Sequence, residues 1–395
     1  MGRTLAAMRA VIVASAAACL ALAPIPSAAL AVPAWQSWQT IPGVFDLGGP
    51  RSDGSLAVAG SATLYLVDVA GNVTPFARGV GGYHEDPGAE AYLAVSPGAH
   101  VAAAGCDFNR DDVFLLRLHV PFGIERVDAP GENTGPFANV AGVTTLNGIA
   151  FDTTGAFDHR LLASGVNGGR TVIAAIDCNG TVQVITSAGP ALEGGLVVAP
   201  SNFGSFGGDL IGPDEYSGRI YAIAPDGTVT TLAKPTLPTG GDIGVESLGF
   251  VPAGFMRGGS IYLADRKTAN NPHPGTDYIL RLSSADLAAA GVQEGDLLAA
   301  TEGGARMVAV RCRATCDVIP VVAAPTTAHG EGHIVFTRGR AGPGPTPSPT
   351  PSPTPKASSP ASPGAISAST VLIAGLVVLA LLAFGAGLIL RRRRH

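Results

Sequence analysis

The chain has 395 residues, of which 14% are charged and 46% are apolar, with 53 glycines and 31 prolines. This composition excludes a disordered acidic chain and a coiled coil, and the lack of a glycine triplet period excludes collagen. Residues 32–340 hold 18 of the 25 basic residues and all 30 acidic residues, so this body has a net formal charge of −12. An acidic body argues against a nucleic-acid partner and is compatible with cation binding.

The N-terminus has the features of a secretory signal peptide. An apolar run at 10–23 follows two arginines, two prolines end it, and Ala29-Leu30-Ala31 offers a small-x-small cleavage site. We therefore expect residues 1–31 to be removed. The prolines argue against a retained membrane helix. A lipid anchor on Cys19 is disfavoured because Ala16 stands where such signals carry a large aliphatic residue.

Short β-like runs separated by Gly, Asp, Asn and Pro fill residues 44–337. A paired-strand unit around an Asp-Gly or Asn-Gly turn recurs about six times, with starts about 50 residues apart. Representative strands span 62–69, 113–119, 171–176, 219–223, 260–264 and 307–311. Four strands in about 50 residues is the size of a propeller blade, so the sequence predicts an all-β, six-bladed β-propeller over 32–340. A β-sandwich is the weaker alternative, because it does not explain the repeat.

We expect the ring to close through its two ends. The strand at 333–337 would supply the inner strand of the blade begun by residues 55–77. Such pairing of distant segments would remove the open edge of the first and last blades.

Four cysteines remain once the leader is removed, as expected for an exported protein. Cys312 and Cys316 flank a predicted hairpin turn, and we expect a disulfide between them. Cys106 is placed between the second and third strands of its blade, and Cys178 between the third and fourth strands of the next. Those loops lie on opposite faces of a propeller, so the sequence predicts no bond between Cys106 and Cys178 unless the strand register is displaced.

An acid or amide precedes the apolar run that begins the inner strand of five blades. These residues are Glu90, Asn147, Glu193, Glu246 and Glu331. Several carboxylates facing one axis cannot all stay ionised without compensation. Oxygen ligands at ~2.3–2.6 Å suit calcium, so the pattern predicts an axial calcium ion (Ca²⁺) held by this set. The alternative is that each side chain binds a neighbouring backbone amide or faces solvent.

The segment Asn147-Gly-Ile-Ala-Phe-Asp152 resembles the inner-strand motif of the gluconolactonase/regucalcin and strictosidine-synthase-like propellers. The resemblance implies a divalent cation at the axis, bound by a Glu, an Asn and an acid that match Glu90, Asn147 and Glu193. Two departures stand out. Glu193 replaces the usual Asp, and Glu90 is followed by Ala91 where the family has Gly.

Further polar residues are expected on the same face as these five. They are His84, Glu85, Asp86, Asp107, Arg110, Asp111, Asp214, Glu215, Tyr216, Asn270, Asn271, His273 and His329. A histidine beside a bound cation could act as a general base on metal-activated water, although loop histidines are more often simply solvated. The sequence contains no GxSxG elbow, no HExxH, no P-loop and no strand-following GxGxxG.

The C-terminal residues are predicted to display the body at a membrane. Residues 341–365 include alternating proline at 345–355, which favours a stiff polyproline II stalk. Residues 366–390 are uncharged and mostly apolar, long enough for a helix across a ~30 Å hydrocarbon core. The basic tail, residues 391–395, is expected in the cytoplasm. Removal of stalk and helix as a processing signal is the alternative.

These features predict a bacterial cell-surface protein, anchored through one C-terminal helix, with an extracellular body. We expect it to be a binding or scaffold module for an extracellular ligand, a glycan or a small-molecule substrate. The alternative is a metal-dependent lactonase or esterase-type hydrolase, and a quinone-dependent sugar dehydrogenase comes third. Whether the protein is catalytic, and on what substrate, is left open by the sequence.

Overall fold

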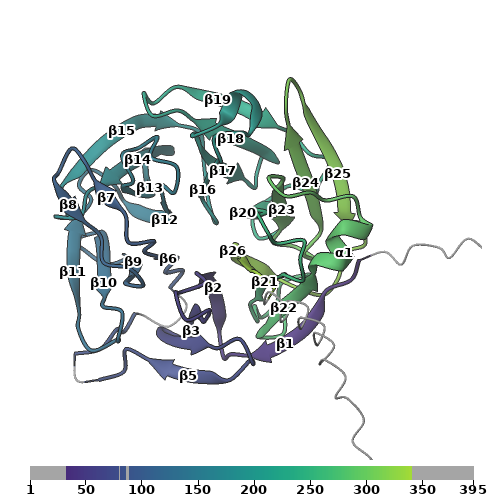
Figure 1. Ribbon diagram of the computed structural model, residues 1–395, viewed down its shortest axis with the longest axis horizontal. Coiled ribbons are helices and arrows are strands. Elements are labelled where there is room, and N and C mark those ends of the chain that lie inside the picture. The colour runs from purple at the N-terminus through teal and green to yellow at the C-terminus, as the bar shows by residue number, and fades with distance from the viewer. Residues whose placement is uncertain (1–32, 80, 86–88, 340–395) are drawn as a thin grey trace, which may run out of the picture. The chain divides into compact units, whose positions relative to one another are not determined.

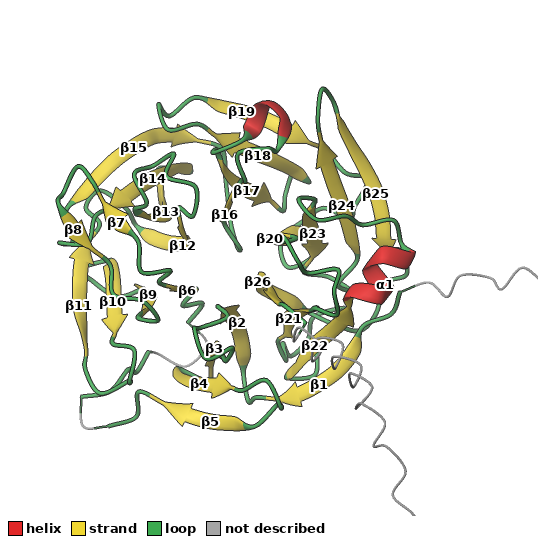
Figure 2. Ribbon diagram, viewed as in Figure 1, coloured by secondary structure: helices red, strands yellow, loops and turns green. Residues whose placement is uncertain are grey.

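The computed structural model describes residues 33–79, 81–85 and 89–339. The predicted leader, stalk, membrane helix and basic tail lie outside this part of the chain. No helix among the described residues is long and apolar enough to span a membrane. Six four-stranded antiparallel sheets form a ring around a central axis (Figure 1; Figure 2). The predicted all-β, six-bladed propeller is therefore confirmed.

Each blade runs from an inner strand at the axis to an outer strand at the rim. In that order, the first blade is β2 (Val44–Gly48), β3 (Leu56–Gly60), β4 (Thr63–Val67) and β5 (Val73–Phe76). The second is β6 (Leu93–Val95), β9 (Val113–Arg117), β10 (Gly123–Val127) and β11 (Thr134–Asn139). The third is β12 (Thr145–Phe151), β13 (Leu161–Asn167), β14 (Arg170–Ile176) and β15 (Val182–Gly189).

The fourth blade is β16 (Val197–Val198), β17 (Leu210–Asp214), β18 (Arg219–Ile223) and β19 (Val229–Ala233). The fifth is β20 (Val245–Phe250), β23 (Leu297–Thr301), β24 (Met307–Cys312) and β25 (Cys316–Val322). The sixth is β26 (Gly330–Thr337), β21 (Ser260–Asp265), β22 (Tyr278–Ser283) and β1 (Gln36–Thr40). Outside the blades lie the hairpin β7 (His100–Val101) and β8 (Cys106–Asp107), the 3₁₀ turn η1 (Gly204–Phe206) and α1 (Ser284–Ala289).

Burial falls from the middle to the edge of each blade. Every residue of β3, β9, β17 and β23 is buried, because each blade packs face to face between two neighbours. The outer strands β15 and β25 are largely exposed. The aliphatic and β-branched runs of the middle strands therefore form the core between blades.

The ring closes through its two ends, but in a different blade from the one predicted. β26 pairs with β21, and β1 pairs with β22, so the sixth blade takes its inner strand from the C-terminal end and its outer strand from the N-terminal end. The blade that contains residues 55–77 already has its own inner strand, β2. That strand was missed because it is short, carries a buried acid at Asp46 and ends at Gly48-Gly49-Pro50.

The last two blades are interleaved along the chain. After β20, the inner strand of the fifth blade, the chain forms β21 and β22 of the sixth blade and then returns through α1 to β23. The inner strands of the two blades lie against each other, since a Cβ on Gly249 would be 2.3 Å from the carbonyl oxygen of Ile334.

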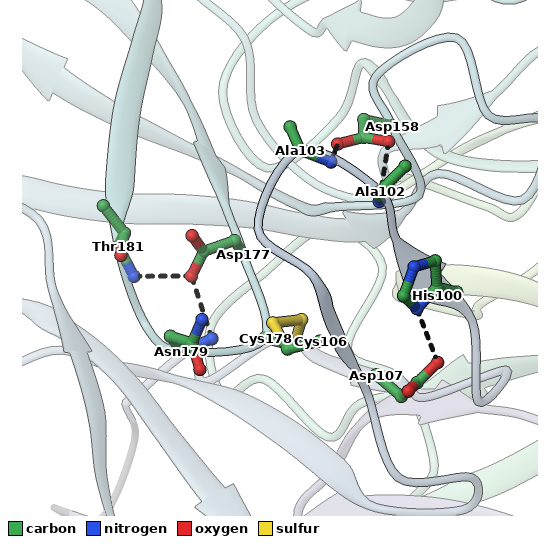
Figure 3. The surroundings of a disulfide bond; sticks show 10 residues. All are labelled: His100, Ala102, Ala103, Cys106, Asp107, Asp158, Asp177, Cys178, Asn179 and Thr181. Carbon is green, nitrogen blue, oxygen red and sulfur yellow. Dashed lines mark hydrogen bonds and ion pairs between the residues drawn. A yellow bond between two sulfur atoms is a disulfide. The ribbon is translucent and has the colours of Figure 1, made fainter.

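The four cysteines of the body form two disulfides. Cys312 bonds Cys316, as predicted. Cys106 bonds Cys178 with a Cα–Cα distance of 5.9 Å, so the prediction that they stay apart was wrong (Figure 3). The predicted strand order of this blade was wrong by one loop, because Cys106 lies in β8, between the first and second strands of its blade. Loops between strands one and two leave a propeller on the same face as those between strands three and four, where Cys178 lies.

Candidate functional site

The residues that precede or begin the inner strands meet at one end of the channel, which we call the acidic mouth. It comprises Glu90, Asn147, Glu193, Glu215, Asp242, Glu246, Arg266, Glu302, His329 and Glu331. All five predicted ligands are in this group. Arg266, Asp242 and Glu302 were not singled out in the sequence, because they lie in loops or at the ends of middle strands, outside the inner-strand pattern.

Glu246 shares with Glu331 the lowest exposed fraction of the five predicted ligands, 2%. The hydroxyl of Tyr92 donates a hydrogen bond to its Oε1. Burial raises the pKa of Glu246 well above its ordinary value, and the charges of Glu331 and Glu302 add to the effect. Gly194 lies directly against this side chain: it has φ +92°, and a Cβ there would be 2.3 Å from Cγ of Glu246. The Glu193-Gly194 step therefore needs its glycine for close packing.

Two cations lie among the carboxylates of the mouth. Arg266 Nη1 is 2.7 Å from Glu90 Oε1 and 3.1 Å from Glu331 Oε1. His329 Nε2 is 2.8 Å from Glu302 Oε1 and 3.2 Å from Glu331 Oε1. Burial alone would lower the pKa of His329, but the hydrogen bonds and charges of the two glutamates raise it to about 10. The ring is therefore an imidazolium at neutral pH.

Glu193 and Glu215 face the mouth with raised pKa values. Burial, followed by the charges of Glu90 and Glu331, raises the pKa of Glu193 to about 7. Burial, with the charge of Glu193 next, raises the pKa of Glu215 to about 8. The Glu193 carboxylate makes no hydrogen bond to any residue that the structure describes, whereas Glu215 Oε2 accepts the Asp242 N–H at 3.0 Å. Glu193 is thus a carboxylate with no fixed partner in that part of the chain.

The side chain of Asn147 is fully engaged by its neighbours. Its Nδ2 donates to the carbonyl oxygen of Leu192, and its Oδ1 accepts the Ser164 hydroxyl at 3.0 Å. Its backbone carbonyl accepts the N–H of Gly194. In this arrangement Asn147 ties the third blade to the segment that carries Glu193.

The donor set best placed for a divalent cation is Glu302, His329 and Glu331. One ligand atom from each lies within 4.8 Å of the others, and all three residues are buried. Nδ1 of His329 is buried and has no hydrogen-bond partner in the described part of the chain. A cation here would replace the proton that His329 shares with the two glutamates, so its binding would release protons. Calcium prefers oxygen ligands, whereas an imidazole ligand suits zinc.

The other polar residues expected on this face divide between the two ends of the channel. Glu215 belongs to the mouth. Arg110 instead lines a cavity at the opposite end, and Asp111 accepts the backbone N–H of Ser52 beside that cavity. Their placement beside the mouth was wrong, for the same register error that misplaced Cys106. Asp86 lies outside the described residues.

A buried ion pair separates the two ends of the channel. Asp46 accepts backbone N–H groups from Leu47, Leu93 and His333. Nδ1 of His333 lies 3.0 Å from both of its carboxylate oxygens, and Nε2 lies 2.9 Å from the carbonyl oxygen of Ile149. A carboxylate and a carbonyl both accept, so both ring nitrogens donate and the ring is cationic. This residue links the sixth, first and third blades across the axis.

Comparison with known proteins gives likenesses of fold. No protein-family model matches the chain, and no curated protein matches its sequence. Virginiamycin B lyase from Staphylococcus aureus is similar at 13% identity, over 77% of this chain and 96% of that one, with a TM-score of 0.42. A gluconolactonase from Xanthomonas campestris is similar at 14% identity, over 59% and 69%, with a TM-score of 0.37. An oxidoreductase from Thermus thermophilus described as a glucose dehydrogenase is similar at 12% identity, over 74% and 88%, with a TM-score of 0.43. The similar structures therefore include a gluconolactonase, the class of protein whose motif the sequence resembles, and a glucose dehydrogenase. These similarities say nothing of the chemistry at this mouth.

Proposed function

We propose that this protein is a cell-surface binding module whose acidic mouth holds a divalent cation and presents it to an extracellular ligand. One observation carries the proposal. Seven carboxyl groups converge there against two cationic side chains, Arg266 and His329, among the described residues. Burial raises the pKa of several of these carboxyls, and a bound cation would compensate the negative charge that they carry when ionised.

Calcium is the first ion to test, because oxygen donors dominate the mouth. Glu193 has no fixed partner among the described residues and is available to ligate. Glu302 and Glu331 would join it once the proton on His329 is displaced. Glu90 would keep its ion pair with Arg266 and would not bind the cation. The proposed ligand set is therefore smaller than the five ligands expected from the sequence. Use of the His329 ring would instead favour zinc.

Display at the cell surface is part of this proposal. It is supported by the leader at 1–31, the apolar residues 366–390 and the basic tail at 391–395. Two disulfides within the body are typical of an oxidising compartment outside the cytoplasm. Membrane fractionation of the full-length chain and of a chain that ends at residue 365 tests the anchor. The full chain should sediment with membranes and the shortened one should be secreted.

Isothermal titration of the full-length chain with Ca²⁺, Mn²⁺ and Zn²⁺ tests the cation site. We expect one ion to bind, with proton release that varies with buffer ionisation enthalpy. Glu193→Gln and Glu302→Gln should each weaken binding about tenfold or more, since each removes a charged ligand. Glu132→Gln, an exposed acid remote from the mouth, is the matched control. Absence of heat for all three ions would contradict the proposal.

A metal-dependent lactonase or esterase is a second candidate, favoured by Glu193. Its pKa of about 7 and its lack of a hydrogen-bond partner among the described residues suit a general base beside a cation site. A bound cation would supply Lewis acidity, and Glu193 would take the proton of an attacking water. A panel of lactones and esters tests this candidate. The hydrolase is supported if the native chain turns over a substrate and Glu193→Gln lowers that turnover about 100-fold with the bound metal unchanged. Metal binding without turnover would favour the binding module instead.

A further inference from the structure

The end of the channel opposite the acidic mouth holds a cavity of about 790 Å³. Its walls come from the second halves of the inner strands, which run from the mouth toward this end. The walls are predominantly apolar and include Leu93, Ile149, Leu196, Phe250, Ile334 and Phe336. A volume of this size is typical of pockets that bury a drug-sized organic molecule, for which ~300–1,000 Å³ is usual.

The charges on this cavity are all of one sign. Arg51, Arg110 and Arg338 line it, and no carboxylate does so among the residues that the structure describes. Arg110 and Arg338 are exposed and form no ion pair within the described ranges. The Arg51 guanidinium is already engaged, since Nη2 donates to the carbonyl oxygen of Ala129 and the group lies over the Phe76 ring. Arg110 and Arg338 are therefore the cations available at the rim. Asp53 and Glu294 interact electrostatically with Arg51 and Arg338 from outside the lining, and Asp111 accepts the N–H of Ser52 at the rim, so the positive sign belongs to the lining residues themselves.

His333 lies on the wall nearest the mouth, where Asp46 compensates its positive charge. Its ring lines the cavity and is held as a cation between Asp46 and the carbonyl of Ile149. The Asp46–His333 pair lies between this cavity and the mouth, so the channel has an acidic end and an end lined by arginines.

We infer that the cavity is a binding site for a small organic anion with an apolar body. Its carboxylate, sulfonate or phosphate group would lie at the arginine rim, where guanidinium groups form charge-assisted hydrogen bonds. Its ring or alkyl part would lie against the aliphatic and aromatic walls. This site stands on its own residues and does not depend on the cation at the mouth.

Three naphthalene probes of one shape test the inference against the full-length chain by isothermal titration. Naphthalene-2-sulfonate is the anion, naphthalene-2-sulfonamide the neutral analogue and 2-naphthylmethylammonium the cation. We expect the anion to bind about tenfold more tightly than the neutral probe, and the cation least of all. Equal affinity for the three probes, or no binding of the anion at about 1 mM, would overturn the inference.

Variants place the binding at this cavity. Arg110→Gln combined with Arg338→Gln should lower the affinity for the anion about tenfold, and both side chains are exposed, so folding should be unaffected. Arg313→Gln is the matched control, an exposed arginine that does not line the cavity. Glu193→Gln at the mouth should leave anion affinity unchanged. Loss of binding in Glu193→Gln with retention in the double variant would place the anion elsewhere and reject the site.

Discussion

The carboxylate of Asp46 in the first blade and the imidazole of His333 in the sixth form an ion pair at 3.0 Å across the point where the ring closes. Asp46 is fully buried. Gly332 beside it has φ +69°, and a Cβ there would lie 2.2 Å from Oδ1 of Asp46, so the position needs glycine. The pair therefore joins the beginning and end of the described chain. It also marks the boundary between the two ends of the channel.

Asp46→Asn should destabilise the fold. The amide offers one acceptor oxygen to N–H groups that now share two, and it leaves the His333 cation buried without a counter-charge. Breaking a buried pair in this way costs ~3–5 kcal/mol, measured as the free energy of unfolding in urea. Asp317→Asn, at an exposed acid, is the control. Equal stability of the two variants would show that the pair is not a structural link.

The charge on His329 should make stability depend on pH in the alkaline range. Its folded pKa of about 10 lies above the ordinary value of 6.5, so its contribution is complete below about 6.5 and is lost as pH rises toward 10. The difference in unfolding free energy between the native chain and His329→Gln should therefore shrink between pH 6.5 and pH 10. A difference that stays constant over this interval would mean that the ring is neutral.

Glu193→Gln should stabilise the folded chain at pH 8 while it weakens cation binding. The folded pKa of about 7 exceeds the ordinary value of 4.5, so above pH 7 folding must hold an unfavourable half-buried charge. Its removal should add roughly 1 kcal/mol, as is common when a functional group is replaced. At pH 4 the gain should disappear, because the native carboxyl is then largely protonated in both states. Chemical denaturation at the two pH values, without added metal, gives the comparison.

The two disulfides should differ in their effect on stability. Cys106–Cys178 closes 72 positions of sequence, and Cys312–Cys316 only 4. By loop entropy, replacing both cysteines with serine should cost ~4 kcal/mol for the first pair and ~2 kcal/mol for the second. Thermal unfolding under non-reducing conditions measures both. A larger loss for the short loop would show that the first bond does not constrain the unfolded chain.

Much of the architecture could be predicted from local pattern, because each blade repeats a turn and an apolar strand. Glu193, Glu246 and Glu331 could be found because they lie just before or at the start of the inner strands. Arg266 could not, since a lone arginine in a loop gives no sign that it reaches across to Glu90. The interleaving of β21 and β22 was also hidden. Those strands look like any hairpin, and only tertiary pairing decides which blade they join.

The predictions of the ring closure and of the Cys106–Cys178 pairing failed for a related reason. β2 was overlooked because its buried acid, Asp46, breaks the apolar run that marks a strand. The hairpin β7–β8 shifts the strand count in the second blade by one loop. Residues that were placed by counting strands, such as Cys106 and Arg110, were therefore predicted on the wrong face of the propeller. Residues placed by their own flanking pattern did not.

The calcium content of the full-length chain tests the cation site at the mouth most directly. The protein would be equilibrated with Ca²⁺, passed into calcium-free buffer and measured by elemental mass spectrometry alongside the double variant Glu193→Gln, Glu302→Gln. We predict about one equivalent in the native chain and none in the variant, as expected for a site that depends on carboxylate ligands. A native chain free of calcium, or a variant that retains as much as the native chain, would contradict calcium binding at this mouth.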